Sequence, residues 1–388
     1  MSLGIYIQVP FCQTKCTYCN FHTGVVSPAR FAPYVSAVHT EIRECRQRLA
    51  TAGINLPASL AAPTVDTVYF GGGTPSLLDP AHLSAILATI RDTFSTAFSE
   101  VTLEADPQTV DQPKAQAWAA AGINRISFGV QSFSDVELKA AGRMHRRADV
   151  YRAVPILRAA GVASISFDLI AGLPHQTLET WQNSLDELIQ LGPEHVSIYL
   201  LEVDEESRLG SELLRGGTKY SASAVPTDEQ MADFYDLARA QLSHAGYEQY
   251  EISNFAKPGF ASQHNRKYWR REPYLGFGAG AHSFSGTQRW ANAHDAANYV
   301  QAIASGKVPL EQLEDISAGQ ALEEELFLGL RQLEGIDLAR LERAYGTSLE
   351  SRFTRLQQAG LVERYGSVVR LAPARLSISN EAFVELMR

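Results

Sequence analysis

Cysteine and methionine are scarce in this sequence, with four residues of each among 388. Long basic blocks are missing too, and 34 lysines and arginines face 43 acidic residues, which leaves a net charge of −9. That balance argues against general nucleic-acid binding. No apolar run reaches the roughly 18–20 residues of a membrane helix, and the start MSLGIYIQVP lacks the pattern of a signal peptide. We therefore expect a cytoplasmic protein.

The rest of the composition is that of a folded chain. Hydrophobic residues make up 45% and charged residues 20%, so a large core can be buried and disorder is excluded as the general state. The length of 388 residues suits one barrel-sized domain with an appendage.

Short β-rich runs alternate with longer helical patterns over the first 245 residues. The expected strands are 4–9, 65–70, 101–104, 125–130, 164–170 and 195–201. The expected helices lie near 30–50, 79–97, 109–121, 134–141, 148–160, 177–191 and 227–245. The strands read as apolar almost throughout, which suits a parallel sheet covered on both faces. Six strand–helix repeats predict an α/β fold, a partial (β/α)6 TIM-like barrel.

Polar or glycine-rich features follow five of these strands. They are GGGTP at 71–75, Glu104, Gln131, Asp168 and Glu202. In a βα barrel the carboxyl ends of the strands open into one mouth, where active sites lie. Any single feature could be a turn or a helix cap, but five in succession predict a site.

The pattern changes after about residue 290. Segments 319–332, 337–345 and 348–361 read as amphipathic helices, and 361–371 alternates around a Tyr-Gly turn, which predicts a hairpin. We expect domains at 1–290 and 291–388, the second a smaller winged-helix-like α+β unit. Its charges are mixed, which favours a structural or partner-docking role over DNA binding.

Three of the four cysteines, Cys12, Cys16 and Cys19, form C-x3-C-x2-C. Thiolates are soft ligands, which select zinc, Cu(I) or iron–sulfur clusters, and disulfides are improbable with so few cysteines. Three thiolates leave one iron of a [4Fe–4S] cube without a protein ligand. A zinc site completed by His22 is the alternative.

This cysteine motif, with Tyr18 before its last cysteine at the start of a βα barrel, resembles the radical S-adenosylmethionine (SAM) superfamily. The segments YFGGGTPSLL, LEADPQTV, NRISFGVQSF, GRMHR, FDLIAGLPHQT, YEISNFAKPG and HNRKYW resemble its branch with oxygen-independent coproporphyrinogen III oxidase (HemN) and the heme chaperone HemW. The resemblance implies that SAM binds the unique iron, and that an electron from the cluster can cleave it to a 5′-deoxyadenosyl radical.

The resemblance also implies roles for individual residues. Cys12, Cys16 and Cys19 would hold the cluster, and Tyr6 and Tyr18 would flank cluster and SAM. The other implied SAM contacts are Gly72, Gly73, Thr74, Glu104, Gln131, Arg143 and Asp168. A carboxylate suits the ammonium or ribose of SAM, and an arginine suits its carboxylate.

Three features favour the chaperone group over the oxidase. Phe21 stands where the oxidase has a fourth cysteine, and only eleven residues precede Cys12. HNRKYW at 264–269, within a heme-motif segment of about 247–284, matches the chaperone signature, whose His264 would bind heme. Two positions depart from the family: Gln8 replaces a histidine, and Ser262 replaces a cysteine. Covalent heme attachment is therefore not expected.

The resemblance implies a heme chaperone that passes heme to a membrane-bound respiratory heme protein, from the cytoplasm or peripherally at the membrane. Its cofactors would be a 4Fe-4S cluster, S-adenosyl-L-methionine and heme. If SAM is cleaved, an electron donor such as flavodoxin or ferredoxin is required, and the protein would be a monomer or a dimer. The rival reading is an enzyme, either a coproporphyrinogen III oxidase or a radical SAM C-methyltransferase, of which we expect the oxidase not to apply.

Overall fold

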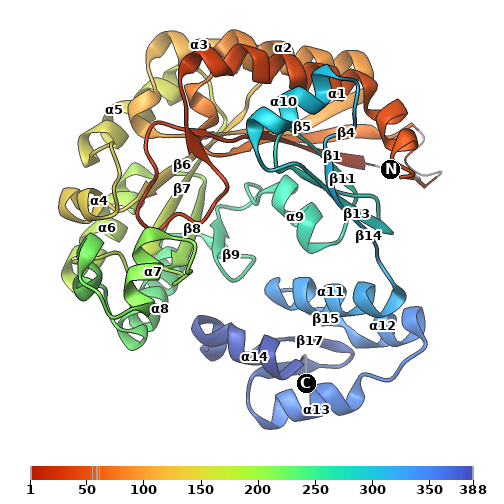
Figure 1. Ribbon diagram of the computed structural model, residues 1–388. Coiled ribbons are helices and arrows are strands. Elements are labelled where there is room, and N and C mark those ends of the chain that lie inside the picture. Colours follow the sequence, from red (N-terminus) through yellow and green to blue (C-terminus); the bar gives the residue numbers. More distant parts are fainter. Residues whose placement is uncertain (1, 55, 58–59, 61, 387–388) are drawn as a thin grey trace.

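The computed structural model describes residues 2–54, 56–57, 60 and 62–386. Its main feature is a curved sheet of twelve strands in the described chain (Figure 1). Six consecutive strands are parallel neighbours, as predicted: β1 (Ser2–Val9), β4 (Thr64–Gly72), β5 (Ser95–Ala105), β6 (Arg125–Gln131), β7 (Ser164–Ala171) and β8 (His195–Leu200). The partial-barrel prediction is thereby confirmed.

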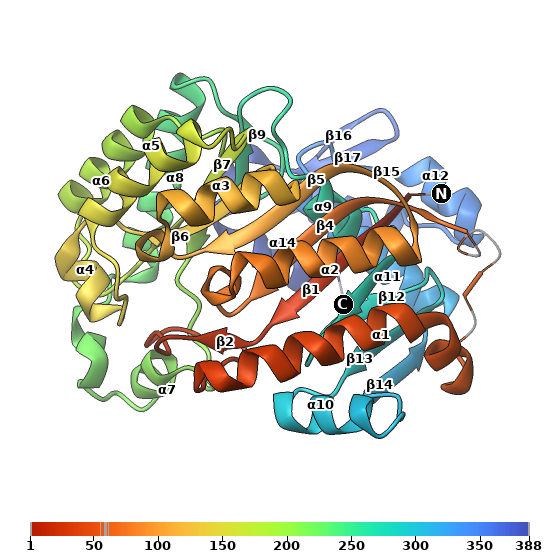
Figure 2. The same ribbon diagram turned by 90° about the horizontal axis from the view of Figure 1, so that it is seen from above.

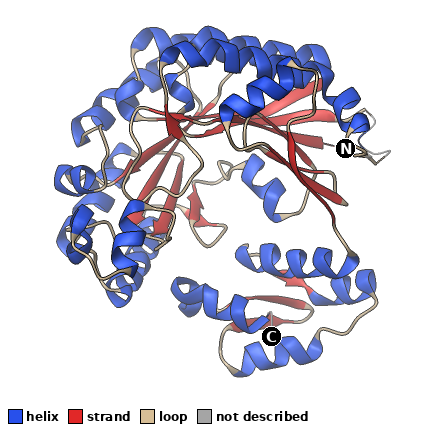
Figure 3. Ribbon diagram, in the orientation of Figure 1, coloured by secondary structure: helices blue, strands red, loops and turns tan. Residues whose placement is uncertain are grey.

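Helices cover the outer, convex face of this sheet (Figures 2 and 3). They are α1 (Phe31–Thr51), α2 (Pro80–Thr93), α3 (Gln112–Ala121), α4 (Asp135–Ala140), α5 (Arg147–Ala159), α6 (Leu178–Leu191) and α8 (Asp228–His244). Side-chain caps fix several starts, with Asp79 accepting from the backbone N–H of Ala81. The predicted helix 79–97 was wrong beyond Thr93, because residues from Ser95 onward pair with β4 as the start of β5.

The sheet continues past both ends of the predicted repeat. Strand β11 (Tyr274–Phe277) lies parallel to β1, and β12 (His282–Phe284), β13 (Gln288–Asn292) and β14 (Leu310–Asp315) follow it antiparallel, with α10 (Ala296–Ala304) between the last two. At the other edge β10 (Asn254–Ala256) and β9 (Glu248–Gln249) follow β8. None of these strands was predicted, because each is short and lies outside the strand–helix rhythm.

The inner face of the parallel strands is polar. Along β6, Arg125, Ser127 and Gly129 line a central cavity, whereas Ile126 and Phe128 are fully buried in the hydrophobic core. Successive residues of a strand point to opposite faces, so these side chains alternate between cavity and helix layer. The expectation of strands apolar almost throughout was therefore wrong for the inner face, and the barrel interior holds a cavity instead of a packed core.

The C-terminal segment forms the predicted helices and hairpin. Its helices are α11 (Ala318–Arg331), α12 (Leu338–Tyr345), α13 (Glu350–Gln358) and α14 (Ser379–Leu386), and its small sheet comprises β15 (Ile336–Asp337), β17 (Val368–Leu371) and β16 (Val362–Tyr365). The hairpin turns at Tyr365-Gly366, where Gly366 has φ +64°. The boundary at residue 290 stays a prediction, and β13 and β14 extend the large sheet to Asp315.

Helix α9 (Gln263–Trp269) lies between the large sheet and α11 (Figure 1). Ion pairs join the two parts of the chain: Arg271 Nε lies 2.7 Å from Glu324, and Arg331 Nη2 lies 2.7 Å from Glu251. The segment that carries the predicted heme histidine is therefore held from both sides. Among the helices of the described residues, we find none with the length and apolar character needed to span a bilayer.

Candidate active site at the barrel mouth

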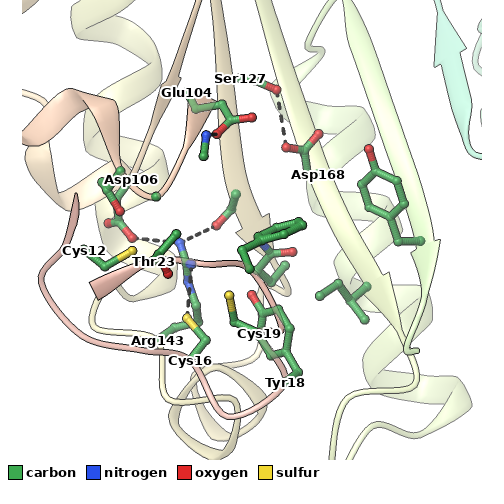
Figure 4. A pocket seen from close by; sticks show the side chains of 18 of the residues that line it. Cys12, Cys16, Tyr18, Cys19, Thr23, Glu104, Asp106, Ser127, Arg143 and Asp168 are labelled. Carbon is green, nitrogen blue, oxygen red and sulfur yellow. Dashed lines mark hydrogen bonds and ion pairs between the residues drawn. The ribbon is translucent and has the colours of Figure 1, made fainter. Parts of the chain in front are cut away.

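A cavity of about 440 Å³ opens at the carboxyl ends of the parallel strands. Figure 4 shows side chains from the cysteine loop, β5, β6 and β7 facing one another there. The cavity brings together eleven of the thirteen predicted site residues: Cys12, Cys16, Tyr18, Cys19, Gly72, Gly73, Thr74, Glu104, Gln131, Arg143 and Asp168. Cys12 and Asp168, which are more than 120 positions apart in sequence, thus line the same cavity, as expected for the mouth of a barrel.

The cysteine loop is anchored by backbone hydrogen bonds on both sides. The N–H of Gly73 donates to the carbonyl of Val9 at 2.8 Å, and the N–H of Thr74 donates to Phe11 at 2.7 Å. Farther along, the N–H of Thr17 donates to Ala141 at 3.0 Å, and that of Leu209 donates to Thr17 at 2.7 Å. The loop is therefore a preorganised part of the mouth.

The three cysteines carry the chemistry that a cluster needs. All three are free thiols that line the same cavity. Burial raises the pKa of the Cys19 thiol, and negative charge on Cys16 or Cys12 raises it further. In the described residues no set of three or more His, Cys, Asp or Glu side chains is arranged to hold a metal ion as it stands. The soft donor set fits an iron–sulfur cluster, which would draw the loop together.

His22, the zinc alternative, is directed elsewhere. Its ring contacts His294 with 4.5 Å between ring centroids, and it is not among the residues that line the cavity in the described chain. This arrangement gives no support to a fourth ligand from His22.

The glycines after β4 are required first by packing. A Cβ on Gly73 would lie 2.5 Å from the carbonyl oxygen of Phe11, and a Cβ on Gly72 would lie 2.4 Å from the amide nitrogen of Gln8. Gly72 also has φ +110°, a region that other residues rarely occupy. Because these glycines have no side chains, the GGGT segment can pack directly against the start of the cysteine loop. This packing requirement is independent of any contact with a ligand.

Glu104 is a buried carboxyl with two donors. Its oxygens accept from the hydroxyl of Tyr69 at 2.9 Å and from the N–H of Gly72 at 3.0 Å. Burial raises its pKa to about 7, and the charge of Asp168 adds to the rise. Asp168 accepts from Ser127 Oγ at 3.3 Å, and burial raises its pKa as well. Two polar carboxyl groups therefore face the same space (Figure 4), suited to hydroxyl or ammonium groups of a ligand.

Arg143 is already engaged in this structure. Its Nη2 lies 2.7 Å from Asp106 Oδ2 and donates to the carbonyl of Gly129 at 2.9 Å, while Nη1 lies 3.5 Å from Cys16 Sγ. Burial would raise the pKa of Asp106, but His145 and Arg143 outweigh it and hold that pKa below its ordinary value. Arg143 thus places a positive charge beside a cluster cysteine, where it favours the thiolate. Its use for a SAM carboxylate stays a prediction.

Gln131 ends β6 in a strained conformation. It has φ +67°, although it is not glycine, and the pairing of β6 with β7 shifts register just before it. Left-handed backbone at a non-glycine residue is concentrated at functional sites. The left-handed conformation bends the backbone at the end of β6, where Gln131 lines the cavity.

Two predicted residues, Tyr6 and His264, are not among those that line the cavity in the described chain. The Tyr6 hydroxyl donates to Gln8 Oε1 at 2.8 Å, so the family departure at Gln8 provides a hydrogen-bond acceptor. His264 is 1% exposed, with Nδ1 2.9 Å from Thr67 Oγ1 and Nε2 2.8 Å from the Tyr268 hydroxyl. Burial lowers its pKa to about 3, so the imidazole is neutral. Both ring nitrogens are occupied here, and heme binding by His264 stays a prediction.

Ser262, the second departure, has a structural role. It is fully buried, caps α9 by accepting from the N–H of Asn265 at 3.3 Å, and donates to Glu100 at 3.2 Å. Glu100 also accepts from the N–H groups of Gln263 and His264. A carboxylate at a helix start is favourable, so serine here helps to dock α9 under the barrel.

Several polar residues that line the cavity were missed in the sequence, among them Tyr69, Arg125, Ser127, Ser197 and Asn265. The period-2 alternation of RISFGVQ was the available signal for Arg125 and Ser127, because every second residue is small or polar. Asn265 belongs to the HNRKYW segment, but nothing in the sequence placed it at this cavity, which it reaches from α9 through tertiary packing.

Comparisons with known proteins agree with this geometry. A family model described as the Radical SAM superfamily matches residues 6–188, and a HemN C-terminal domain model matches residues 316–374. The solved structure of the Escherichia coli coproporphyrinogen III oxidase HemN, described as a radical SAM enzyme, superposes with a TM-score of 0.82 over 99% of this chain and 89% of that one. The two are 21% identical in sequence, so this likeness shows the fold.

Closer relatives in sequence are curated proteins named heme chaperone HemW. The one from Bacillus subtilis is 34% identical over 384 residues, which cover 97% of each chain. The one from Mycobacterium tuberculosis is 35% identical over 370 residues, which cover 94% of this chain and 89% of the relative. Membership of the radical SAM superfamily implies a [4Fe–4S] cluster and SAM. With a barrel mouth lined by three cysteines and end-to-end similarity to these relatives, the chain belongs to the HemW family of the radical SAM superfamily.

Proposed function

We propose that this protein is a heme chaperone, which carries a SAM-capped [4Fe–4S] cluster, binds heme and passes it to a membrane-bound respiratory heme protein. The observation that carries the proposal is the similarity over 97% of the chain to a relative named heme chaperone HemW. Phe21, in place of a fourth cysteine in the cluster loop, supports it. We also propose that the protein works in the cytoplasm or peripherally at a membrane.

In this proposal Cys12, Cys16 and Cys19 hold the cluster, which when bound offers one open iron to SAM and can supply an electron. Arg143 stabilises the thiolate of Cys16 from 3.5 Å. Glu104 and Asp168 orient hydroxyl or ammonium groups within the cavity. An external donor such as flavodoxin or ferredoxin would be needed for electron supply.

Heme binding through His264 requires a local opening. The imidazole is neutral, which is the form that ligates heme iron, but its Nε2 lies 2.8 Å from the Tyr268 hydroxyl. That hydrogen bond must break before iron can bind Nε2. Movement of α9 away from the sheet would uncover the ring together with the aromatic faces of Tyr268 and Trp269.

A heme titration of the anaerobically reconstituted full-length protein tests this proposal. His264→Ala should weaken heme binding and leave the cluster absorbance intact, while Tyr268→Phe should tighten heme binding because it removes the competitor for Nε2. Tyr365→Phe, on the exposed hairpin, is the matched control for the second variant. Unchanged heme affinity in His264→Ala would remove His264 from the heme site.

The same preparation separates the chaperone from the rival enzyme. Incubation with coproporphyrinogen III, SAM and a reductant should yield no protoporphyrinogen. Its formation would contradict the chaperone proposal. Failure of wild-type protein to bind heme at all would contradict it independently.

A further inference from the structure

Arg125 is a buried cation without a matching acceptor. It begins β6, is 3% exposed, and lines the cavity. Within the described chain its Nε and Nη1 are buried and have no hydrogen-bond partner. Buried polar groups in folded proteins are almost always paired, and a charged donor left unpaired is especially unfavourable. The guanidinium therefore calls for an acceptor that the chain does not provide.

The nearest acidic groups do not fill this role. Glu100 is occupied by Ser262 and by the backbone N–H groups at the start of α9, and Asp168 accepts from Ser127. In the described residues, neither Nε nor Nη1 of Arg125 forms a hydrogen bond with either carboxylate. Burial alone would lower the pKa of Arg125, but the charge of Glu100 leads the effects that raise it, so the guanidinium stays positive.

The two arginines of the cavity differ in this respect. Arg143, beside the cysteine loop, is paired with Asp106 at 2.7 Å, whereas Arg125 is unpaired. Arg125 and Gln131 lie at opposite ends of β6, about 20 Å apart at roughly 3.3 Å per residue. The cavity thus runs inward from the cluster loop to a second polar end, which we name the inner subsite: Arg125, Ser127, Asp168, Ser197 and Asn265.

We propose that the inner subsite binds the carboxylate of a small-molecule ligand through the guanidinium of Arg125. A planar guanidinium matches a carboxylate in a two-point hydrogen bond, and Nε and Nη1 are the two unpaired nitrogens. Asn265 also lines the cavity, and its side-chain amide is a further possible donor. Asp168 faces the same space, so the ligand must also present a hydroxyl or a cation there.

The carboxylate that fits this subsite is a propionate of heme, a ligand that rests on the proposed function. The family resemblance places SAM at the unique iron beside the cluster loop, at the other end of β6, so the carboxylate of SAM is not the candidate here. The dimethyl ester of heme lacks free carboxylates while retaining most of the remaining structure.

The test measures binding of heme and heme dimethyl ester to full-length, anaerobically reconstituted protein. Wild type should bind heme about 10- to 100-fold more tightly than the ester, the range expected for a hydrogen bond to a charged group. Arg125→Met should abolish that preference, and Arg125→Lys, which keeps the charge, should restore part of it. Arg152→Met, an exposed arginine paired with Asp149, is the control and should keep the preference.

Equal binding of heme and its dimethyl ester by wild type would overturn the inference even if Arg125→Met fails to fold, and it would leave the proposed function standing. An Arg125→Met protein that retains its cluster and its full preference for heme over the ester would overturn the inference too, because the carboxylate would then bind elsewhere. Failure of wild type to bind heme at all would overturn both proposals, so the two failures are distinguishable.

Discussion

The contact between Gly73 and the cysteine loop gives the most direct test of how the site is built. In Gly73→Ala, the new Cβ would lie 2.5 Å from the carbonyl oxygen of Phe11 and 2.9 Å from its carbon and nitrogen. All three are backbone atoms, so no side-chain rotation can relieve the overlap. The segment or the loop must move by several tenths of an ångström.

The cost follows from that displacement. Overpacking of a well-packed region destabilises by about 1–3 kcal/mol. The adjacent N–H of Thr74 donates to Phe11 at 2.7 Å, and loss of such a bond adds about 1 kcal/mol. We expect Gly73→Ala to lower the free energy of unfolding by roughly 2–4 kcal/mol. Because Cys12 follows Phe11 directly, the iron content after reconstitution should fall as well.

Urea denaturation and iron analysis of the purified protein measure both effects. Gly319→Ala is the matched control, because its Cβ would meet nothing within 4 Å and Gly319 lies in α11. Alanine is favoured over glycine in a helix by about 0.5–1 kcal/mol, so this variant should be slightly stabilised. A Gly73→Ala protein with wild-type stability and full iron content would refute the proposed packing of the GGGT segment on the loop.

Three other predictions concern the cluster, Glu104 and the ion pairs between α11 and the residues near α9 and β13. Cys16→Ala should abolish the iron–sulfur absorbance of reconstituted protein, and a full cluster in that variant would refute the three-cysteine site. Burial raises the folded pKa of Glu104 from 4.5 to about 7, so its ionisation destabilises the fold as pH rises through that interval. Glu104→Gln should therefore gain stability over wild type between about pH 4.5 and 7, by up to ~3 kcal/mol, and a pH-independent difference in urea denaturation would contradict this. Glu324 pairs with both Arg271 and Arg289 at 2.7 Å, so Glu324→Gln should speed hydrogen exchange in α9 several-fold. Glu323→Gln, which breaks one exposed pair with Arg352, should leave that exchange unchanged.

Local sequence determined most of the secondary structure. The strand–helix rhythm predicted all six central parallel strands, because hydrophobic runs and helix caps act over a few residues. The helix predicted at 79–97 extended too far, since pairing with β4 draws Ser95 onward into β5. The short edge strands β9 to β14 carry little local signal and form only against the sheet already present.

In the candidate site, too, some features were determined by local sequence and others only by the tertiary structure. The spacing of Cys12, Cys16 and Cys19 determined which residues carry the cluster chemistry, because three thiols on one loop can reach one centre whatever surrounds them. Tertiary structure alone decided that Arg143 is paired while Arg125 is not, and that His264 lies between Thr67 and Tyr268. These outcomes depend on which distant side chains meet inside the barrel. Burial then sets what each group can bind, because a charge or a donor without water must find its partner within the space that the fold encloses.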